Sequence, residues 1–426
     1  MRRSATLFFV VLLTTFALAQ DAAKSSSQTA SQAEPKSVTV PITLDHDRIV
    51  IDVYLTLPDW STQRVRGWVD NGNPDLYLSR RASTLMGLLV TCDDKVCTAP
   101  PPREITIGGM KIPLGDAIKE ARIPLKPVSA ASVMAPGMNA EINLPSTVLR
   151  NYDVLVSFPD RQLTIGQPGT ISFRGTKGKV LINAANGLIQ IPSKIENKNY
   201  NLALDLGSPI SFLSADLFDK LSTAHADWPH MTGAVGPANM WGLDDEPKWK
   251  LMRVDRVQYG SLFLTDVPMV DFPQDTMSWF EKRAGMSTVG LISSQVLLNY
   301  RVGIDYAHSL AYFEIGSTFR FPDFDVIGLV LRPELDGRYT ILSAADFEGK
   351  PSVPEVQAGD HLLAVDGIPV PGSTMGQVWS MLGGSPGKER KLTVERQGKQ
   401  FTVVARVQHF LGELPDEDGK GKSKKK

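Results

Sequence analysis

The 426-residue chain carries 45 basic and 46 acidic side chains, so its formal net charge at pH 7 is −1. This balance argues against nucleic acid or an anionic membrane as an electrostatic partner. The length predicts about two to four globular domains.

The N-terminal residues are typical of an export signal. Arg2 and Arg3 precede an apolar run, residues 5–18, which is shorter than the roughly 20 residues of a membrane-spanning helix. Ala17 and Ala19 then give the small-x-small pattern that signal peptidase reads. We expect residues 1–19 to be a signal peptide and the mature protein to be periplasmic or secreted, without stable membrane insertion.

The amino-acid composition of the sequence changes at Ser37. Residues 20–36 are rich in Ser, Ala, Gln and Lys and predict a disordered linker. After them, short β-type runs such as 49–55 and 104–109 alternate with Gly, Pro, Asn and Asp. Because long helical periodicity is scarce, we expect a mostly β protein.

An internal repeat organises this β region. Residues 68–79 match residues 203–214, since both contain Asp-x-Gly-x-Pro followed by Leu-Ser. A second pair of blocks, 146–154 and 294–302, follows in the same order. Two matched blocks in the same order predict two homologous lobes, residues 37–170 and residues 171–318.

Cys92 and Cys97 are the two cysteines of the chain, and they bracket a predicted turn, residues 93–95. In an oxidising compartment this spacing favours a disulfide that clips a hairpin. A metal site would need further ligands, and no histidine is close in the sequence. We therefore predict a disulfide and no metal.

Each lobe presents one aspartate, Asp70 or Asp205, directly after an apolar strand and two residues before a glycine. A pseudo-twofold relation between the lobes would bring the two carboxylates face to face. Two carboxylates at about 3 Å share one proton. One can then activate a water molecule while the other protonates a scissile carbonyl. The pair therefore predicts peptide hydrolysis.

These motifs resemble the aspartic protease superfamily, in its retropepsin-like or pepsin-like form with two lobes fused in one chain. The family's Asp-Thr/Ser-Gly motif is represented by Asp70 with Gly72 and by Asp205 with Gly207. The later Gly-hydrophobic-hydrophobic-Gly motif keeps its first glycine at Gly290 and loses both glycines in the first lobe. The resemblance implies a two-lobed β fold, peptide hydrolysis and no cofactor.

The sequence departs from the family where a hydroxyl follows each aspartate and ties the two loops together. Asn71 and Leu206 stand there; Asn71 can still donate a hydrogen bond, and Leu206 cannot. Ser208 keeps a hydroxyl in the second lobe, whereas Asn73 replaces its counterpart. Two interpretations therefore stay open: an active endopeptidase, and an inactive protease-like protein that binds peptides or acts as a scaffold.

Two segments are candidates for a flap over the cleft. In the second lobe, residues 233–236 with residues 240–242 predict a hairpin. In the first lobe, the hairpin between Cys92 and Cys97 occupies the corresponding place. Either could be an ordinary surface hairpin.

Residues 324–408, called the C-terminal segment below, resemble a PDZ domain. Residues 359–367 give a Gly-Asp entry to an apolar strand and an Asp-Gly hairpin turn. Residues 374–382 predict a short groove helix, and residues 391–396 and 400–407 predict closing strands. A solvated, disordered tail is expected over 409–426.

PDZ domains bind extended C-terminal peptides by adding a strand to a sheet edge. The resemblance implies that a loop offers backbone N–H groups to the peptide carboxylate, and its residues are Ile327, Gly328, Leu329 and Val330. The alternative is a PDZ domain that only packs on the lobes.

No Gly-x-Ser-x-Gly or His-Glu-x-x-His motif supports a serine or zinc hydrolase. The leading hypothesis is an exported aspartic endopeptidase that recruits protein or peptide substrates through this segment.

Overall fold

The computed structural model describes residues 34–412, except Lys95, Asp116, residues 125–136, Pro273 and residues 318–322. The predicted signal peptide, nearly all of the predicted linker and most of the predicted tail lie outside the described residues. Among the helices of the described part, none is long and apolar enough to cross a membrane. From Pro35 onward the described residues belong to one compact unit.

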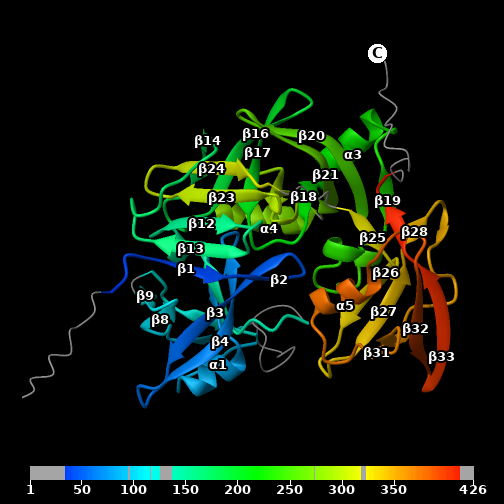
Figure 1. Ribbon diagram of the computed structural model, residues 1–426, viewed down its shortest axis with the longest axis horizontal. Helices are drawn as coiled ribbons and strands as arrows, with labels where there is room; N and C mark the ends of the chain where they lie inside the picture. Colours follow the sequence, from blue (N-terminus) through cyan, green and yellow to red (C-terminus); the bar gives the residue numbers. More distant parts are fainter. Residues whose placement is uncertain are drawn as a thin grey trace, which may run out of the picture. The chain divides into compact units, whose positions relative to one another are not determined.

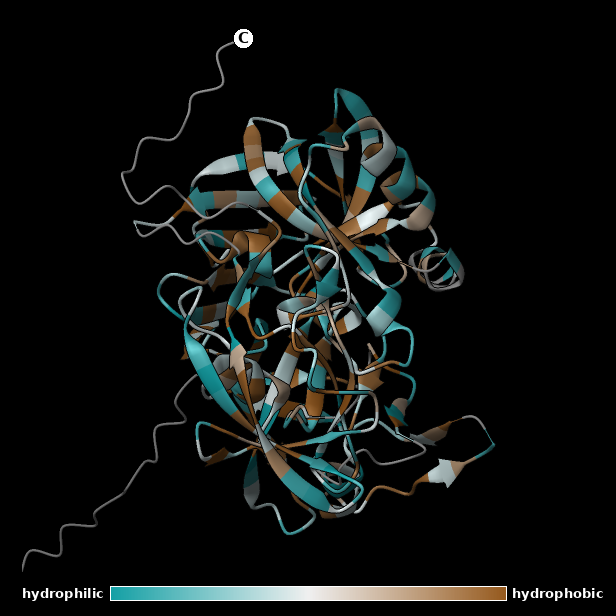
Figure 2. Cartoon of the chain, turned by 90° about the vertical axis from the view of Figure 1, so that its right-hand side faces the viewer, coloured by the Kyte–Doolittle hydropathy of each residue, from teal (hydrophilic) through white to brown (hydrophobic). Residues whose placement is uncertain are grey.

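The fold is mostly β, which confirms the predicted fold class. Apolar and polar residues alternate along many of the strands (Figure 2), and in β3 the side chains of Ile49, Ile51, Val53 and Leu55 are fully buried. The first repeat contains β1 Ser37–Pro41, β2 Thr43–Asp45, β3 Arg48–Thr56, β4 Thr62–Asp70, β5 Leu76–Tyr77, α1 Arg80–Leu85, β6 Thr91–Cys92, β7 Cys97–Ala99, β8 Glu104–Ile107, β9 Met110–Pro113, β10 Ala121–Ile123, β11 Ile142–Pro145, α2 Ser146–Leu149, β12 Asp153–Ser157 and β13 Gln162–Gly166.

The second repeat follows a similar order of elements. A strand that ends in aspartate is again followed by a short strand and a helix, and a later strand pairs with it in parallel. Its elements are β14 Thr176–Lys179, β15 Leu181–Ile182, β16 Ile189–Ile195, β17 Lys198–Asp205, β18 Ser211–Ser214, α3 Ala215–Ala224, β19 His230–Thr232, η1 Gly236–Ala238, η2 Glu246–Lys248, β20 Lys250–Tyr259, β21 Leu262–Phe272, α4 Gln274–Ala284, β22 Gly290–Ser293, η3 Gln295–Leu297, β23 Tyr300–Asp305 and β24 Leu310–Ile315.

One six-stranded sheet, of order β1-β13-β12-β23-β24-β14, takes strands from both repeats (Figure 1). At its centre β12 pairs antiparallel with β23, and Leu155 lies opposite Gly303. These two residues are equivalent positions in the aligned repeats. The local twofold relation between the repeats therefore passes through this pair of strands.

The C-terminal segment forms a second β region with one α-helix. Its main sheet has the order β26-β27-β30-β32-β33, so β26 is an edge strand. The predicted groove helix is α5, whose N-cap Thr374 forms a capping box with Gln377. The elements are β25 Phe324–Val326, β26 Leu329–Pro333, β27 Tyr339–Ala344, β28 Asp346–Phe347, β29 Lys350–Pro351, β30 His361–Val365, β31 Ile368–Pro369, α5 Met375–Leu382, β32 Glu389–Arg396, β33 Lys399–Arg406 and β34 Gln408–Phe410.

The second repeat and the C-terminal segment share a hydrophobic core. Met231 and Leu251 of the repeat belong to the same buried cluster as Leu329 and Val378 of the segment. Phe410, in β34, is also fully covered within this cluster. The ordered chain therefore continues past residue 408, because the last strand buries an aromatic side chain.

Candidate active site

The two aspartates occupy equivalent places in the fold. Asp70 is the last residue of β4 and Asp205 the last residue of β17, and only 2% and 9% of their surfaces are exposed. In the parallel partner strands, Pro145 lies beside Asp70 and Ser293 beside Asp205. The strand ends therefore present both carboxyl groups in the same way.

Each aspartate faces the turn of the other repeat. A Cβ atom on Gly72 would lie 2.1 Å from Asp205 Oδ2, and one on Gly207 would lie 2.8 Å from Asp70 Oδ1. Atoms at these separations would overlap, so any residue with a side chain at either glycine would push a carboxyl group aside. Glycine is required here by the close approach of the two loops, which brings the predicted pair into one site.

Asn71 ties the two loops together. Its Nδ2 donates to the carbonyl oxygen of Leu204 at 2.8 Å, and its Oδ1 accepts from the N–H of Leu206 at 2.7 Å. The sequence suggested a donor alone, whereas the carboxamide supplies a donor and an acceptor. Leu206 itself packs into the core. One side chain from the first repeat therefore makes both cross-loop bonds.

Asp205 is surrounded by backbone donors. Its Oδ1 accepts from the N–H of Gly207 at 2.7 Å and from the N–H of Ser208 at 3.2 Å. The Ser208 hydroxyl instead donates to the carbonyl oxygen of Ile210 at 2.8 Å. Ser208 therefore reaches the aspartate through its main chain rather than through the hydroxyl.

Asn143 holds Asp70, a role that the sequence analysis did not assign. Its Nδ2 donates to Asp70 Oδ2 at 3.1 Å and to the carbonyl oxygen of Asp75, while its Oδ1 accepts from the N–H of Tyr77. Asn143 stands where the first lobe loses its second glycine motif. A fully buried polar residue inside an apolar strand is the signal that could have identified it.

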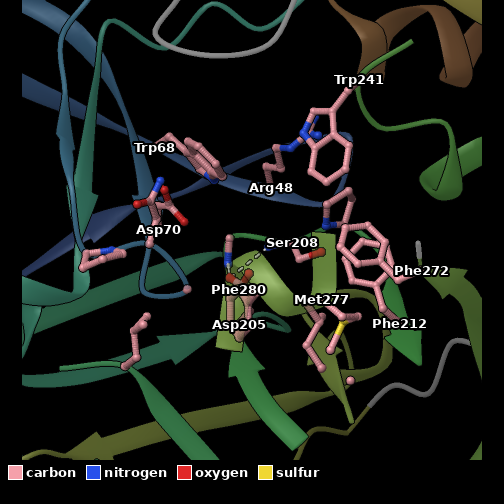
Figure 3. Close-up of a pocket in the computed structure, with 18 residues that line it drawn as sticks. Arg48, Trp68, Asp70, Asp205, Ser208, Phe212, Trp241, Phe272, Met277 and Phe280 are labelled. Carbon is pink, nitrogen blue, oxygen red and sulfur yellow. Dashed lines mark hydrogen bonds between the residues drawn. The ribbon is translucent and has the colours of Figure 1, made fainter. Parts of the chain in front are cut away.

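A cavity of about 140 Å³ contains the aspartates. Its walls are mainly apolar and aromatic, and Figure 3 shows Arg48 among the residues that line it. The lining residues are Arg48, Trp68, Asp70, Gly72, Asn73, Pro74, Leu188, Asp205, Gly207, Ser208, Pro209, Phe212, Trp241, Phe272, Met277, Phe280, Gly290 and Leu291.

Arg48 is the second functional residue that sequence reasoning missed. It begins β3, is 3% exposed, and its Nη2 donates to the carbonyl oxygen of Met240 at 3.0 Å. A cation at the head of the apolar run 49–51 was the available signal, because a buried charge requires partners. Its position in the cavity places a positive charge near the two carboxyl groups.

The surroundings of the two aspartates determine which carboxyl group holds a proton. Burial, and then the negative charge of Asp205, raise the pKa of Asp70 well above its usual value. Burial also raises the pKa of Asp205 to about 6, although backbone N–H donors and the charge of Arg48 oppose this rise. Because Asp205 has more donors to its charged form, we assign the shared proton to Asp70 and the charge to Asp205.

The prediction that the flap candidate of the second lobe forms a hairpin is wrong. Residues 233–242 form no paired strands; they contain the short helix η1 and continue through Asn239 and Trp241. Ala234, Val235, Ala238 and Met240 are fully buried because they share a core with the C-terminal segment. Trp241 does line the cavity.

The other flap candidate forms the expected hairpin. β6 pairs antiparallel with β7, and a disulfide joins Cys92 to Cys97 across the pair. None of its described residues lines the cavity that holds the aspartates. The described part of this hairpin is therefore separate from the candidate site.

The predicted carboxylate-binding loop is buried, and two of its N–H donors are occupied. Ile327, Leu329 and Val330 have no exposed surface. The N–H of Ile327 donates to the carbonyl oxygen of Leu382, and the N–H of Leu329 donates to that of Ile327. A peptide carboxylate could use these two groups only after they were released.

Within the described residues, no group of three or more His, Cys, Asp or Glu side chains could hold a metal ion.

Comparisons with solved structures find many similar chains. A crystal structure of the aspartic proteinase from Irpex lacteus is similar, with a TM-score of 0.39 and 11% sequence identity. The match covers 66% of this chain and 98% of the proteinase. No protein-family model and no curated protein sequence match the chain.

Proposed function

We propose that this protein is an aspartic endopeptidase that hydrolyses peptide bonds with Asp70 and Asp205. The observation that carries the proposal is the reciprocal approach of Gly72 to Asp205 and of Gly207 to Asp70 in one cavity. Asn71 supports it further, since its two cross-loop hydrogen bonds meet the need that Leu206 leaves open.

The protonation pattern suits a water-activating pair. The charged Asp205 would take a proton from a water molecule, and the protonated Asp70 would donate its proton to the carbonyl oxygen of the scissile bond. Water then adds to the carbonyl carbon. The tetrahedral intermediate breaks down when Asp205 passes the proton taken from water to the leaving nitrogen and Asp70 recovers a proton from a hydroxyl of the intermediate, which becomes the new carboxyl group. Each carboxyl group therefore has a separate task, and neither can replace the other.

The export and recruitment predictions belong to the same proposal. An exported enzyme fits the N-terminal sequence pattern, and capture of C-terminal peptides, which the PDZ resemblance implies, would require release of the occupied N–H groups of Ile327 and Leu329. The recruitment role is tested by peptides with free and amidated C-termini. Equal affinity for both forms would rule out recognition of the carboxylate.

The second candidate function is peptide binding without hydrolysis, which the missing hydroxyl at Leu206 favours. Digestion of a peptide library by the mature protein, from acid to neutral pH, separates the two candidates. We expect cleavage that is strongest at mildly acidic pH and that disappears in both Asp70→Asn and Asp205→Asn. Cleavage that persists in both variants would assign the activity to a contaminant, and a protein that binds peptides without cleaving them would support the second candidate.

A further inference from the structure

Residues 233–242 of the second repeat, called the strap below, run along the edge strand of the C-terminal segment. A Cβ atom on Gly233 would lie 3.6 Å from Val330 Cγ2, and one on Gly242 would lie 2.7 Å from the Cα of Arg332. The end of the strap at Gly242 therefore packs against β26, and its beginning at Gly233 packs most closely against Ala345, directly after β27. The strap covers the strand edge at which the PDZ resemblance would place a peptide.

Asn239 joins the strap to this edge by two hydrogen bonds. The N–H of Leu331 donates to Asn239 Oδ1 at 3.0 Å, and Asn239 Nδ2 donates to the carbonyl oxygen of Leu331 at 2.9 Å. An added strand would pair with both backbone groups of one edge residue in the same way. Asn239 has no exposed surface, so these bonds are shielded from water and hold its position firmly.

The same stretch of chain reaches the candidate active site. The carbonyl oxygen of Met240 accepts from Arg48 Nη2 at 3.0 Å, and Trp241 lines the cavity with Arg48. Glu246 holds the stretch from the other side, since its carboxylate accepts from Asn239 Nδ2 and from the N–H of Trp241. The Leu331 main chain is thus linked to Arg48 through the hydrogen bonds of the Asn239 side chain, the peptide bond from Asn239 to Met240, and the hydrogen bond from Arg48 to the Met240 carbonyl oxygen.

We propose that Asn239 is a positioning residue of the active site: anchored on the edge of β26, it holds the Met240 carbonyl that fixes the Arg48 guanidinium beside the two aspartates. This inference rests on the proposed endopeptidase function. It gives the C-terminal segment a part in building the catalytic centre, which differs from the recruitment of substrates.

Arg48 stands among several charged groups. Its positive charge is attracted by four carboxyl groups, those of Asp45, Glu246, Asp70 and Asp205. The same charge acts to lower the pKa values of His46 and Asp47. The cation favours the charged form of both active-site carboxyl groups. If Arg48 loses its anchor and turns away, both carboxyl groups should hold their protons to higher pH.

The test is the pH dependence of kcat/KM for Asn239→Ala in the full-length mature protein. Both limbs of the bell-shaped profile should move up by about 1 pH unit, the size of shift that an opposite charge at close range produces. At the original optimum, kcat should fall by less than about fourfold with little change in KM, because the protonation of the pair rather than binding is disturbed. Asn239→Ser is the second variant if Asn239→Ala does not fold.

Arg48→Met should reproduce the shift, and the double variant should shift no further, since both changes remove one effect. Arg253→Ala is the matched control. It removes another contact between the second repeat and the C-terminal end, the 2.7 Å bond from Arg253 Nε to the Leu411 carbonyl oxygen, away from the cavity. Its profile should keep the original limbs. A shift of equal size in this control would overturn the proposal.

Glu246 requires a separate control variant because burial raises its pKa to about 7. If Glu246→Gln alone moves the profile as far as Asn239→Ala does, the effect belongs to Glu246 and the proposal fails. Carboxyl-carbon NMR titration of Asp205 provides a readout without turnover. An upward shift in Asn239→Ala supports the inference even if the wild-type protein cleaves no peptide, whereas an unchanged Asp205 pKa refutes it even if the enzyme is active.

Discussion

Asn71 makes two hydrogen bonds between the loops with one carboxamide at the centre of the candidate site. A hydroxyl on each loop would give one donor and one acceptor per loop; Asn71 offers both from the same side chain. This makes the junction between the loops asymmetric. Asn71 and the N–H of Gly72, which bonds Asp205, supply hydrogen bonds from the first repeat, whereas the side chain of Leu206 contributes packing.

Asn71→Ala should therefore destabilise the fold and slow catalysis. It leaves the Leu204 carbonyl and the Leu206 N–H buried without partners, at about 1–3 kcal/mol each. We expect the free energy of unfolding in urea to fall by about 2–6 kcal/mol and kcat/KM to fall at least about tenfold, since catalytic geometry is sensitive to small displacements.

Leu206→Thr is the companion variant. Because Asn71 already makes both cross-loop bonds, adding a hydroxyl at position 206 should raise kcat/KM less than about twofold and cost stability by burying a polar group. A large increase in rate would mean that the loops are held loosely in the natural protein.

At the scale of elements, the hairpin β6–β7 is a local feature separate from the candidate active site. The disulfide closes a loop with a sequence separation of 5, and none of the described hairpin residues lines the cavity. The parallel pairs β4–β11 and β17–β22 instead carry the aspartates. Changes in the hairpin should therefore affect stability and leave the chemistry intact.

The double variant Cys92→Ala/Cys97→Ala tests this separation. We expect a loss of about 2 kcal/mol in unfolding free energy, the chain-entropy contribution of so short a loop, with unchanged kcat/KM. In the natural protein, thiol titration of the unreduced, denatured chain should find no free thiol. A strong fall in activity of the double variant would show that the hairpin reaches the substrate.

At the scale of the whole molecule, several acidic side chains are buried or half-buried. Burial raises the pKa values of Asp47, Asp205 and Asp271 to about 6 and that of Glu246 to about 7. These groups hold more protons in the folded chain than in the unfolded chain between about pH 4 and 7. Their contribution is full below the unfolded pKa and is lost as pH rises through the folded values.

The melting temperature should accordingly be higher at pH 5 than at pH 8. Differential scanning calorimetry at constant ionic strength measures the difference, and Glu246→Gln should reduce the decline between pH 6 and pH 8. An increase in melting temperature over this range would mean that these acids are ionised and well paired in the folded protein.

The sequence by itself determined the β class, the repeat, the aspartate pair, the cysteine hairpin and the helix α5. Each depends on local patterns: alternation along a strand, glycine in a tight turn, or an N-cap. The close approach of the two aspartates followed from the repeat, because similar folds related by a twofold axis bring equivalent residues together.

Only the tertiary structure decided the roles of Arg48, Asn143 and Asn239. Asn239 contacts Leu331, which is 92 residues away in the chain, and Arg48 contacts Met240, which is 192 residues away. Tertiary packing also decided that residues 233–242, which were predicted to form a hairpin, form the strap instead. The reason is physical: a buried polar group or strand edge must find a partner, but neighbouring residues do not specify which distant segment will supply it.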